Sequence, residues 1–168
     1  MLIIFGGLPG TGKTTLAKLI AKQLKAVYLR VDTVEQALKK CSNPDHVTGP
    51  EGYMVCYAIA LDNLKLGLSV VADSVNSIAI TRNDWQKVAK DAHHPVIEIE
   101  LVCSDPQEHQ HRIESREADI PGHKLPQWID VLHRDYEPWQ SKSMTLDTSE
   151  YSVHESVTII MDFINQNH

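Results

Sequence analysis

The stretch GLPGTGKT, residues 7–14, places three glycines and one proline in a single turn at the start of an otherwise good helix. Glycine costs about 1 kcal/mol relative to alanine inside a helix, so helix stability does not explain this composition. The stretch fits the pattern G-x-x-x-x-G-K-S/T, with the apolar run LIIFG (residues 2–6) before it and a helical pattern over residues 13–25 after it. A strand before this pattern and a helix after it are the context in which it binds nucleotide phosphates. The sequence therefore predicts a phosphate-binding loop rather than a flexible glycine turn.

The predicted loop builds an anion site from its backbone and from two side chains. Glycines let consecutive backbone N–H groups point at one anion, and the N-terminus of the following helix adds roughly half a positive charge. We expect Lys13 to reach the β- and γ-phosphates and the Thr14 hydroxyl to bind Mg²⁺. The residues expected to contact the nucleotide here are Gly7, Pro9, Gly10, Thr11, Gly12, Lys13, Thr14 and Thr15.

Short apolar strands alternate with amphipathic helices along the whole chain. The predicted strands cover residues 2–6, 26–31, 68–73, 96–103 and 143–149. The predicted helices cover residues 13–25, 33–40, 50–67, 81–94, 105–119 and 126–136, with a last one from residue 152, and capping boxes begin at Thr81 and Ser152. This alternation predicts a three-layer α/β fold, in which a parallel sheet is covered by helices on both faces, as one domain over residues 1–168.

Asp32 follows one predicted strand and Asp73 ends another, so both lie at the edge where ligands collect in parallel α/β sheets. If the second predicted strand is the neighbour of the first, Asp32 lies beside the loop, where its carboxylate could deprotonate an acceptor hydroxyl. The alternative for Asp32 is an N-cap, and the two roles are compatible. Asp73 ends the apolar run VVAD and is predicted to bind both acceptor and Mg²⁺, with a turn or cap as the alternative. Tyr53 is a further candidate for the acceptor pocket, with core packing as its alternative.

Three arginines are candidates for binding anions. Arg82 lies near the start of its predicted helix, where a cation opposes the helix dipole, so we expect it to bind the acceptor unless it is simply an exposed side chain. Arg112 and Arg116 are four residues apart on one helix face, next to the irregular segment DIPGHKLP (residues 119–126). We predict that they clamp a phosphate from a lid over residues 112–126, with solvated salt bridges as the alternative.

Composition and charge argue against several classes of partner. The formal net charge of −6 argues against long nucleic acid, although a local arginine cluster still acts on a small phosphate over about 8 Å at physiological salt. No apolar run is long enough to span a bilayer and LIIFGG lacks a basic flank, so we expect a cytoplasmic protein without membrane contact. The nine histidines and three cysteines lack metal-ligand spacing, so we expect no transition-metal site and reduced thiols. The oligomeric state is open between monomer and dimer.

The chain resembles the small P-loop kinases of the nucleoside-monophosphate kinase-like group, which include chloramphenicol phosphotransferase, the polynucleotide kinase domain and zeta-toxin-like kinases. The resemblance is carried by GLPGTGKTT (7–15), VD (31–32), VVAD (70–73), HRIESR (111–116) and LDTSEYSVHES (146–156). It implies a five-stranded parallel sheet, ATP with Mg²⁺, transfer of the γ-phosphoryl group to a hydroxyl, and a mobile lid that carries arginines.

The resemblance also implies roles for individual residues of this sequence. The implied catalytic residues are Lys13, Asp32, Arg112 and Arg116, with Asp32 as the acid that activates the acceptor hydroxyl. The loop over residues 148–152 would border the adenine, so Ser149 and Arg112 are expected nucleotide contacts. Asn76 and the lid sequence DIPGHK match no known acceptor signature, so the acceptor does not carry over.

We therefore expect an ATP-dependent kinase that phosphorylates a hydroxyl of a small metabolite or antibiotic-like molecule. One alternative is a kinase for a polynucleotide end or a nucleotide sugar, and another is a regulatory ATPase without a small acceptor. The sequence has no guanine-reading N-K-x-D motif, so the choice of ATP rests on the resemblance.

Overall fold

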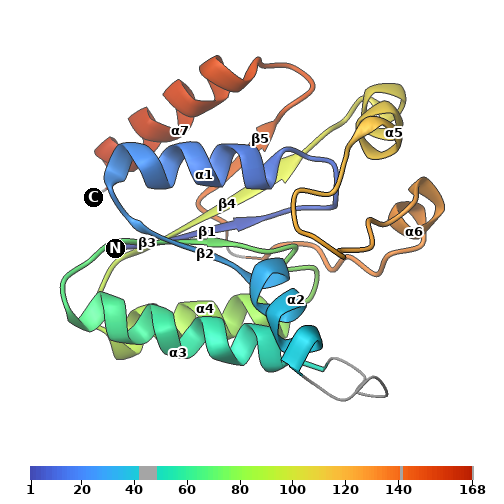
Figure 1. The fold of residues 1–168 in the computed structure, drawn as a ribbon. Coiled ribbons are helices and arrows are strands. Elements are labelled where there is room, and N and C mark those ends of the chain that lie inside the picture. The colour runs from blue at the N-terminus through green and yellow to red at the C-terminus, as the bar shows by residue number, and fades with distance from the viewer. Residues whose placement is uncertain (42–48, 141, 168) are drawn as a thin grey trace.

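The computed structural model describes residues 1–41, 49–140 and 142–167. Its centre is an all-parallel sheet of five strands in the order β2-β3-β1-β4-β5 (Figure 1). The strands are β1 (Leu2–Gly6), β2 (Val27–Arg30), β3 (Val70–Asp73), β4 (Val96–Val102) and β5 (Met144–Asp147). This architecture confirms the predicted α/β fold with its five-stranded parallel sheet.

Helices cover both faces of the sheet and form a further group at its carboxyl edge (Figure 1). One face carries α1 (Lys13–Leu24) and α7 (Val153–Gln166), and the other carries α3 (Glu51–Lys65) and α4 (Ala79–Asp91). The helices toward the edge where the strands end are α2 (Val31–Cys41), α5 (Pro106–Ser115) and α6 (Trp128–Leu132).

The central position of β1 explains why LIIFG is apolar throughout. Ile3 and Phe5 belong to the core under α1 and α7, whereas Leu2 and Ile4 belong to the core under α3 and α4. All four side chains are fully buried, and complete burial of such a side chain contributes about 1.5–3 kcal/mol. Because β1 is held from both faces, the loop that follows it starts from a fixed position.

The predicted start of α4 is wrong. The helix begins at Ala79, and the Thr81 hydroxyl donates to the Ile78 carbonyl (2.9 Å) instead of capping the helix. The Ala79 N–H donates to Glu137 Oε2 (2.6 Å), so a carboxylate distant in the sequence satisfies this end of the helix. A contact of this kind leaves no local pattern in the sequence.

The predicted end of α5 is also wrong, whereas the predicted start of α7 is confirmed. α5 ends at Ser115 and not at residue 119, because Arg116 has an extended backbone (φ −77°, ψ 146°). At α7, Ser152 accepts from the Glu155 N–H, and the Glu155 side chain accepts from the Ser152 N–H. This reciprocal pair is the predicted capping box.

The strand order changes the expected surroundings of Asp32. β3 lies between β1 and β2, so the second strand is not the neighbour of the first. α2 begins at Val31, which places Asp32 inside its first turn rather than in front of the helix. Asp73, paired in register with Phe5, is therefore the acid next to β1, and Asp32 lies one strand further from the loop.

Candidate active site

The loop between β1 and α1 needs its glycines for two separate reasons. Gly7, Gly10 and Gly12 have φ angles of +134°, +87° and +84°, a region that residues with a Cβ rarely adopt. A Cβ on Gly7 would also lie 2.1 Å from the Leu101 carbonyl oxygen, and one on Gly10 would lie 2.8 Å from Ile113 Cδ1. This close packing on β4 and α5 fixes the loop at the N-terminus of α1, where the helix dipole favours a phosphate.

Lys13, the first residue of α1, holds its ammonium group inside this loop. The residue is 8% exposed, and Nζ donates to the Leu8 carbonyl (2.7 Å). Burial lowers the pKa of Lys13 to about 8, even though the charges of Asp73 and Asp32 act in the opposite direction. A phosphate bound at the loop would supply the direct anionic partner that favours the charged form.

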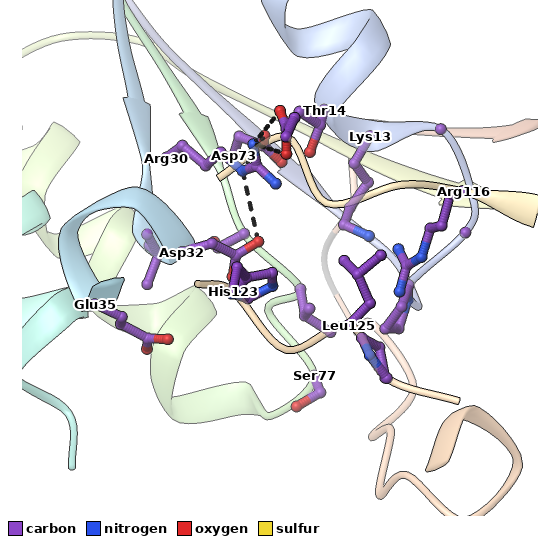
Figure 2. A pocket seen from close by; sticks show the side chains of 18 of the residues that line it. Lys13, Thr14, Arg30, Asp32, Glu35, Asp73, Ser77, Arg116, His123 and Leu125 are labelled. Atoms are coloured by element: carbon purple, nitrogen blue, oxygen red, sulfur yellow. Dashed lines mark hydrogen bonds and ion pairs between the residues drawn. The ribbon is translucent and has the colours of Figure 1, made fainter. Parts of the chain in front are cut away.

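A cavity of about 1080 Å³ lies at the carboxyl edge of the sheet, between the loop and the segment that follows α5 (Figure 2). The predicted residues that line it are Pro9, Gly10, Gly12, Lys13, Thr14, Thr15, Asp32, Tyr53, Asp73, Arg112 and Arg116. The predicted residues that do not line it are Gly7, Thr11, Arg82 and Ser149. Its volume suits a nucleotide together with a second small molecule, because sites for one drug-sized ligand span about 300–1,000 Å³.

Asp32 and Asp73 share one arginine, which the sequence analysis missed. Arg30 Nε lies 3.5 Å from Asp32 Oδ2 and 3.9 Å from Asp73 Oδ2. Asp73 is 2% exposed and also accepts a hydrogen bond from the Tyr28 hydroxyl (2.7 Å). Burial and the Asp73 charge raise the pKa of Tyr28, so its hydroxyl stays a donor. Arg30 therefore holds two carboxylates at one wall of the cavity, and its place at the end of a predicted strand is the signal that could have identified it.

Arg116 offers a buried guanidinium group to the loop side of the cavity. Its Nε and Nη2 atoms are buried and have no hydrogen-bond partner among the described residues. Burial lowers the pKa of Arg116, and the charge of Asp32 partly offsets that effect. An arginine fork matches the geometry of phosphate oxygens, so this group can bind an anion on the same side of the cavity as Lys13 (Figure 2).

Arg112 has a different environment, although it also lines the cavity. Its Nε donates to Glu108 Oε1 (2.8 Å), while Nη1 and Nη2 donate to the Thr148 hydroxyl and carbonyl (2.8 and 2.9 Å). Arg112 thereby ties α5 to the loop between β5 and α7. It also borders a second cavity of about 340 Å³, whose lining residues are Gly12, Thr15, Leu16, Arg112, Thr148, Tyr151, Ser152, Val153 and Ser156.

Ser149 lies beside this second cavity without lining it. Its hydroxyl donates to Asp147 Oδ1 (2.6 Å) and lies 3.3 Å from the Ser104 hydroxyl. The neighbouring Thr148 and Tyr151 line the cavity instead. Residues of the loop therefore border this cavity, but Ser149 does not face it, and the expected contact with adenine stays a prediction.

Arg82 does not reach the cavity, in contrast to the expected acceptor contact. It is 5% exposed and donates to the backbone carbonyls of Asn76 (3.4 Å), Glu137 (2.8 Å) and Pro138 (3.3 Å). Its guanidinium carbon lies 5.0 Å from the centre of the Trp139 ring. Through these contacts the guanidinium group connects α4 with the segment before β5. Arg82 therefore stabilises the fold and does not line the cavity.

The segment between α5 and α6, which belongs to the predicted lid, lines part of the cavity. Asp119 accepts from Arg30 Nη1 at 2.9 and 2.7 Å and from Lys18 Nζ at 2.9 Å. These two cations hold the pKa of Asp119 well below its usual range. His123 Nδ1 lies 3.1 Å from Gln36 Nε2 on α2. The lid residues therefore contact β2, α1 and α2 directly, through pairs that no sequence motif marks.

The predicted metal residues, Thr14 and Asp73, both line the cavity. A hydroxyl and a carboxylate are oxygen ligands of the kind that Mg²⁺ combines with nucleotide phosphates and water. Within the described ranges, no group of three or more His, Cys, Asp or Glu side chains could hold a metal ion. The residues present therefore fit Mg²⁺ that takes its further ligands from a nucleotide.

The comparisons with known proteins agree with this geometry. A family model described as an AAA domain (AAA_33) matches residues 2–134. The chain belongs to this family. The matched range contains the phosphate-binding loop, both acids and the lid arginines. A search of curated proteins finds no match. No helix among the described residues has the length and hydropathy needed to cross a membrane.

Solved structures show the same fold over nearly the whole chain. A "putative kinase" from Chloroflexus aurantiacus has a TM-score of 0.73 at 24% identity, covering 96% of this chain and 97% of that one. The APS kinase CysC of Mycobacterium tuberculosis, in complex with AMPPNP and APS, has a TM-score of 0.71 at 17% identity, covering 98% and 96%. Kti12 of Chaetomium thermophilum, in complex with ADP-AlF3, has a TM-score of 0.70 at 21% identity, covering 98% and 99%. These likenesses confirm, at the level of the fold, the predicted resemblance to the small P-loop kinases.

Proposed function

We propose that this protein is an ATP-dependent kinase that transfers the γ-phosphoryl group to a hydroxyl of a small molecule. The observation that carries the proposal is that one cavity, the larger of the two described, is lined both by the phosphate-binding loop (the P-loop) with Lys13 and, on the opposite wall, by Asp32. A site that only bound a nucleotide would need the loop but not a carboxylate facing it across a space for a second molecule. The solved complexes of APS kinase with AMPPNP and of Kti12 with ADP-AlF3 support an adenine nucleotide as the donor.

On the loop side, the chain's own groups would hold the triphosphate and neutralise its charge. Lys13 would contact the β- and γ-phosphates in exchange for its bond to the Leu8 carbonyl, and Arg116 would supply a second cation from the lid. Mg²⁺, held through Thr14, Asp73 and the phosphates, would add a further positive charge at the transferring group. The smaller cavity beside Arg112 and Tyr151 would receive the base.

On the acceptor side, Asp32 would act as the general base. The hydroxyl oxygen of the acceptor attacks the γ-phosphorus, and its proton passes to the Asp32 carboxylate. The bond between the γ-phosphorus and the β–γ bridging oxygen breaks, and ADP leaves with that electron pair. Arg30, 3.5 Å from Asp32 Oδ2, would keep the carboxylate oriented toward the attacking hydroxyl. Positioning and charge neutralisation of this kind account for most of the catalysis in phosphoryl transfer.

Two other functions make different predictions. A regulatory ATPase would release free phosphate without a labelled organic product, and a polynucleotide kinase would label the end of an oligonucleotide with an affinity that falls steeply with salt. The net charge of −6 disfavours the second, and the acceptor space lined by Asp32 and Tyr53 disfavours the first.

The test is incubation of the protein with γ-labelled ATP, Mg²⁺ and a deproteinised extract of small metabolites. We expect a labelled organic phosphate that forms only when the protein is present, and that is lost when Lys13 is replaced by Met. An unphosphorylated oligonucleotide in a parallel reaction checks the nucleic-acid alternative. Release of free phosphate alone, with no labelled organic product, would contradict the proposed function.

A further inference from the structure

Glu35 is a cavity residue to which the function above assigns no role. It follows Asp32 by three positions on α2, so the two carboxylates lie on the same face of that helix. Glu35 lines the cavity and is half-buried, yet it makes no hydrogen bond or ion pair within the described part of the chain. Burial and the charge of Asp32 raise the pKa of Glu35. Its carboxylate oxygens are therefore available to accept hydrogen bonds from a molecule in the cavity.

The packing of α3 against α2 fixes the direction of Glu35. A Cβ placed on Gly52 would lie 2.4 Å from Glu35 Cγ, so the absence of a side chain on Gly52 makes room for the Glu35 stem. Glu35 therefore passes close to the backbone of α3 and turns into the cavity. Figure 2 shows it at the lower left of the site, whereas Lys13 and Arg116 lie to the right, near the P-loop.

The cavity that Glu35 lines also contains hydroxyl groups and cationic side chains. The cavity on this side is lined by Tyr53, Ser77 and Thr81. Arg30 is paired with Asp119 and also faces Asp32, and His123 contacts Gln36. Lys39 and Arg134, both exposed, lower the pKa of Glu35 against the larger effects of burial and the Asp32 charge, and Arg134 also lines the cavity.

We propose that Glu35 selects the acceptor, which is a polyhydroxylated compound without an anionic group. This inference rests on the proposed kinase function. A carboxylate can only accept hydrogen bonds, so the acceptor must present a second donor, a hydroxyl or an ammonium group, to Glu35 while its reacting hydroxyl meets Asp32. An acceptor that carried a carboxylate, sulfate or phosphate here would bring a third negative charge beside two carboxylates, which disfavours its binding.

The experiment separates the metabolite extract by charge before the labelling reaction. Neutral, cationic and anionic fractions are each incubated with γ-labelled ATP and the protein, and the labelled organic products are then compared. The variants are Glu35→Gln, which removes the charge with little change of shape, and Glu35→Asp, which keeps the charge on a shorter side chain. Asp62→Asn, on the exposed surface of α3, is the matched control for loss of one acidic charge.

We expect product from the neutral or the cationic fraction, and the fraction identifies the second donor as a hydroxyl or an ammonium group. For the purified acceptor, Glu35→Gln should raise KM at least about tenfold, which corresponds to 1.4 kcal/mol, with a much smaller change in kcat. Glu35→Asp should restore part of the loss, and Asp62→Asn should match the parent. The affinity for AMPPNP should be the same in all four proteins, because Glu35 lies away from the P-loop.

Product from the anionic fraction alone would overturn the inference while leaving the kinase function in place. The same holds if Glu35→Gln and the parent give equal KM values for a neutral or cationic acceptor. Free phosphate without labelled product in every fraction would overturn the proposed function itself, and this inference with it.

Discussion

The two sides of the cavity are built in different ways. The loop side comes almost entirely from one continuous stretch, residues 7–15, which provides backbone, lysine and hydroxyl together. The other side, where we propose that the acceptor binds, is assembled from α2, α3, the end of β3 and the segment after α5, and its side chains are far apart in the sequence. A phosphate is the same in every nucleotide, so its site can be a local motif, whereas the acceptor site must match one particular molecule.

The two sides of the cavity also differ in the sign of their charges. Lys13 is a buried cation and Arg116 a half-buried one, and neither has an ion pair among the described residues, whereas Asp32 and Glu35 place carboxylates at the opposite wall. Arg30 belongs to the carboxylate side, where it pairs with Asp119 and faces both Asp32 and Asp73. The cavity therefore separates a site for an anion from a site for hydrogen-bond donors.

The largest expected effect comes from the loop side. Replacing Lys13 by Met should lower the rate of phosphoryl transfer about 1,000-fold, the upper end of the loss when one preorganised cation or donor is removed from a transition state. Lys22→Met, on the exposed face of the same helix, is the control and should keep the parent rate. Rates measured with γ-labelled ATP check this prediction. A Lys13→Met rate within tenfold of the parent would contradict it.

Arg116 should give the next largest effect, because its unpaired guanidinium faces the same anion. We expect Arg116→Ala to lower the transfer rate about 100-fold, with a smaller loss of AMPPNP affinity. Arg116→Lys keeps the charge but loses the fork, so it should recover only part of the rate. If alanine at position 116 changed AMPPNP affinity and transfer rate equally, Arg116 would hold the ground state rather than the transferring group.

The pKa of Lys13 should make the affinity for the nucleotide depend on pH. Burial places this pKa at about 8 without nucleotide, and bound phosphate raises it, so binding is favoured below pH 8 and weakens as the pH rises above it. The Kd of AMPPNP should be about tenfold higher at pH 9 than at pH 7. Lys13→Arg, which stays charged throughout, should not show this difference. Isothermal titration calorimetry measures it, and a flat profile in the parent would contradict the assigned pKa.

Arg82 should give the smallest effect on transfer and a clear effect on stability. Replacing it by Met leaves three backbone carbonyls without their donor, so the free energy of unfolding should fall by about 2–3 kcal/mol. At a temperature where the variant is folded, its transfer rate should stay within threefold of the parent rate. This ratio corresponds to a change of at most about 0.7 kcal/mol in the activation free energy. Urea denaturation and rate measurements test both parts. A large loss of transfer rate with an unchanged free energy of unfolding would contradict this prediction and would indicate that Arg82 contacts the acceptor.

The success of sequence reasoning follows the same division. The loop was predictable because its glycines, lysine and threonine are adjacent, and the positions of Asp32 and Asp73 at the cavity were predictable because apolar strands lead into them, while their roles stay predictions. Arg82 was misplaced because its partners, Glu137 to Trp139, are more than fifty residues away and become neighbours only through the fold. The assumed neighbourhood of β1 and β2 failed for a related reason, since strand order is a property of the whole sheet.

The central claim is that the acceptor side performs chemistry that the loop side cannot perform alone, and Asp32→Asn tests it most directly. Asparagine keeps the size of the side chain but cannot take a proton from the attacking hydroxyl. We predict that transfer to the acceptor falls about 100- to 10,000-fold while the Kd of AMPPNP changes less than about threefold. Transfer at the parent rate by the Asp32→Asn protein would contradict the account.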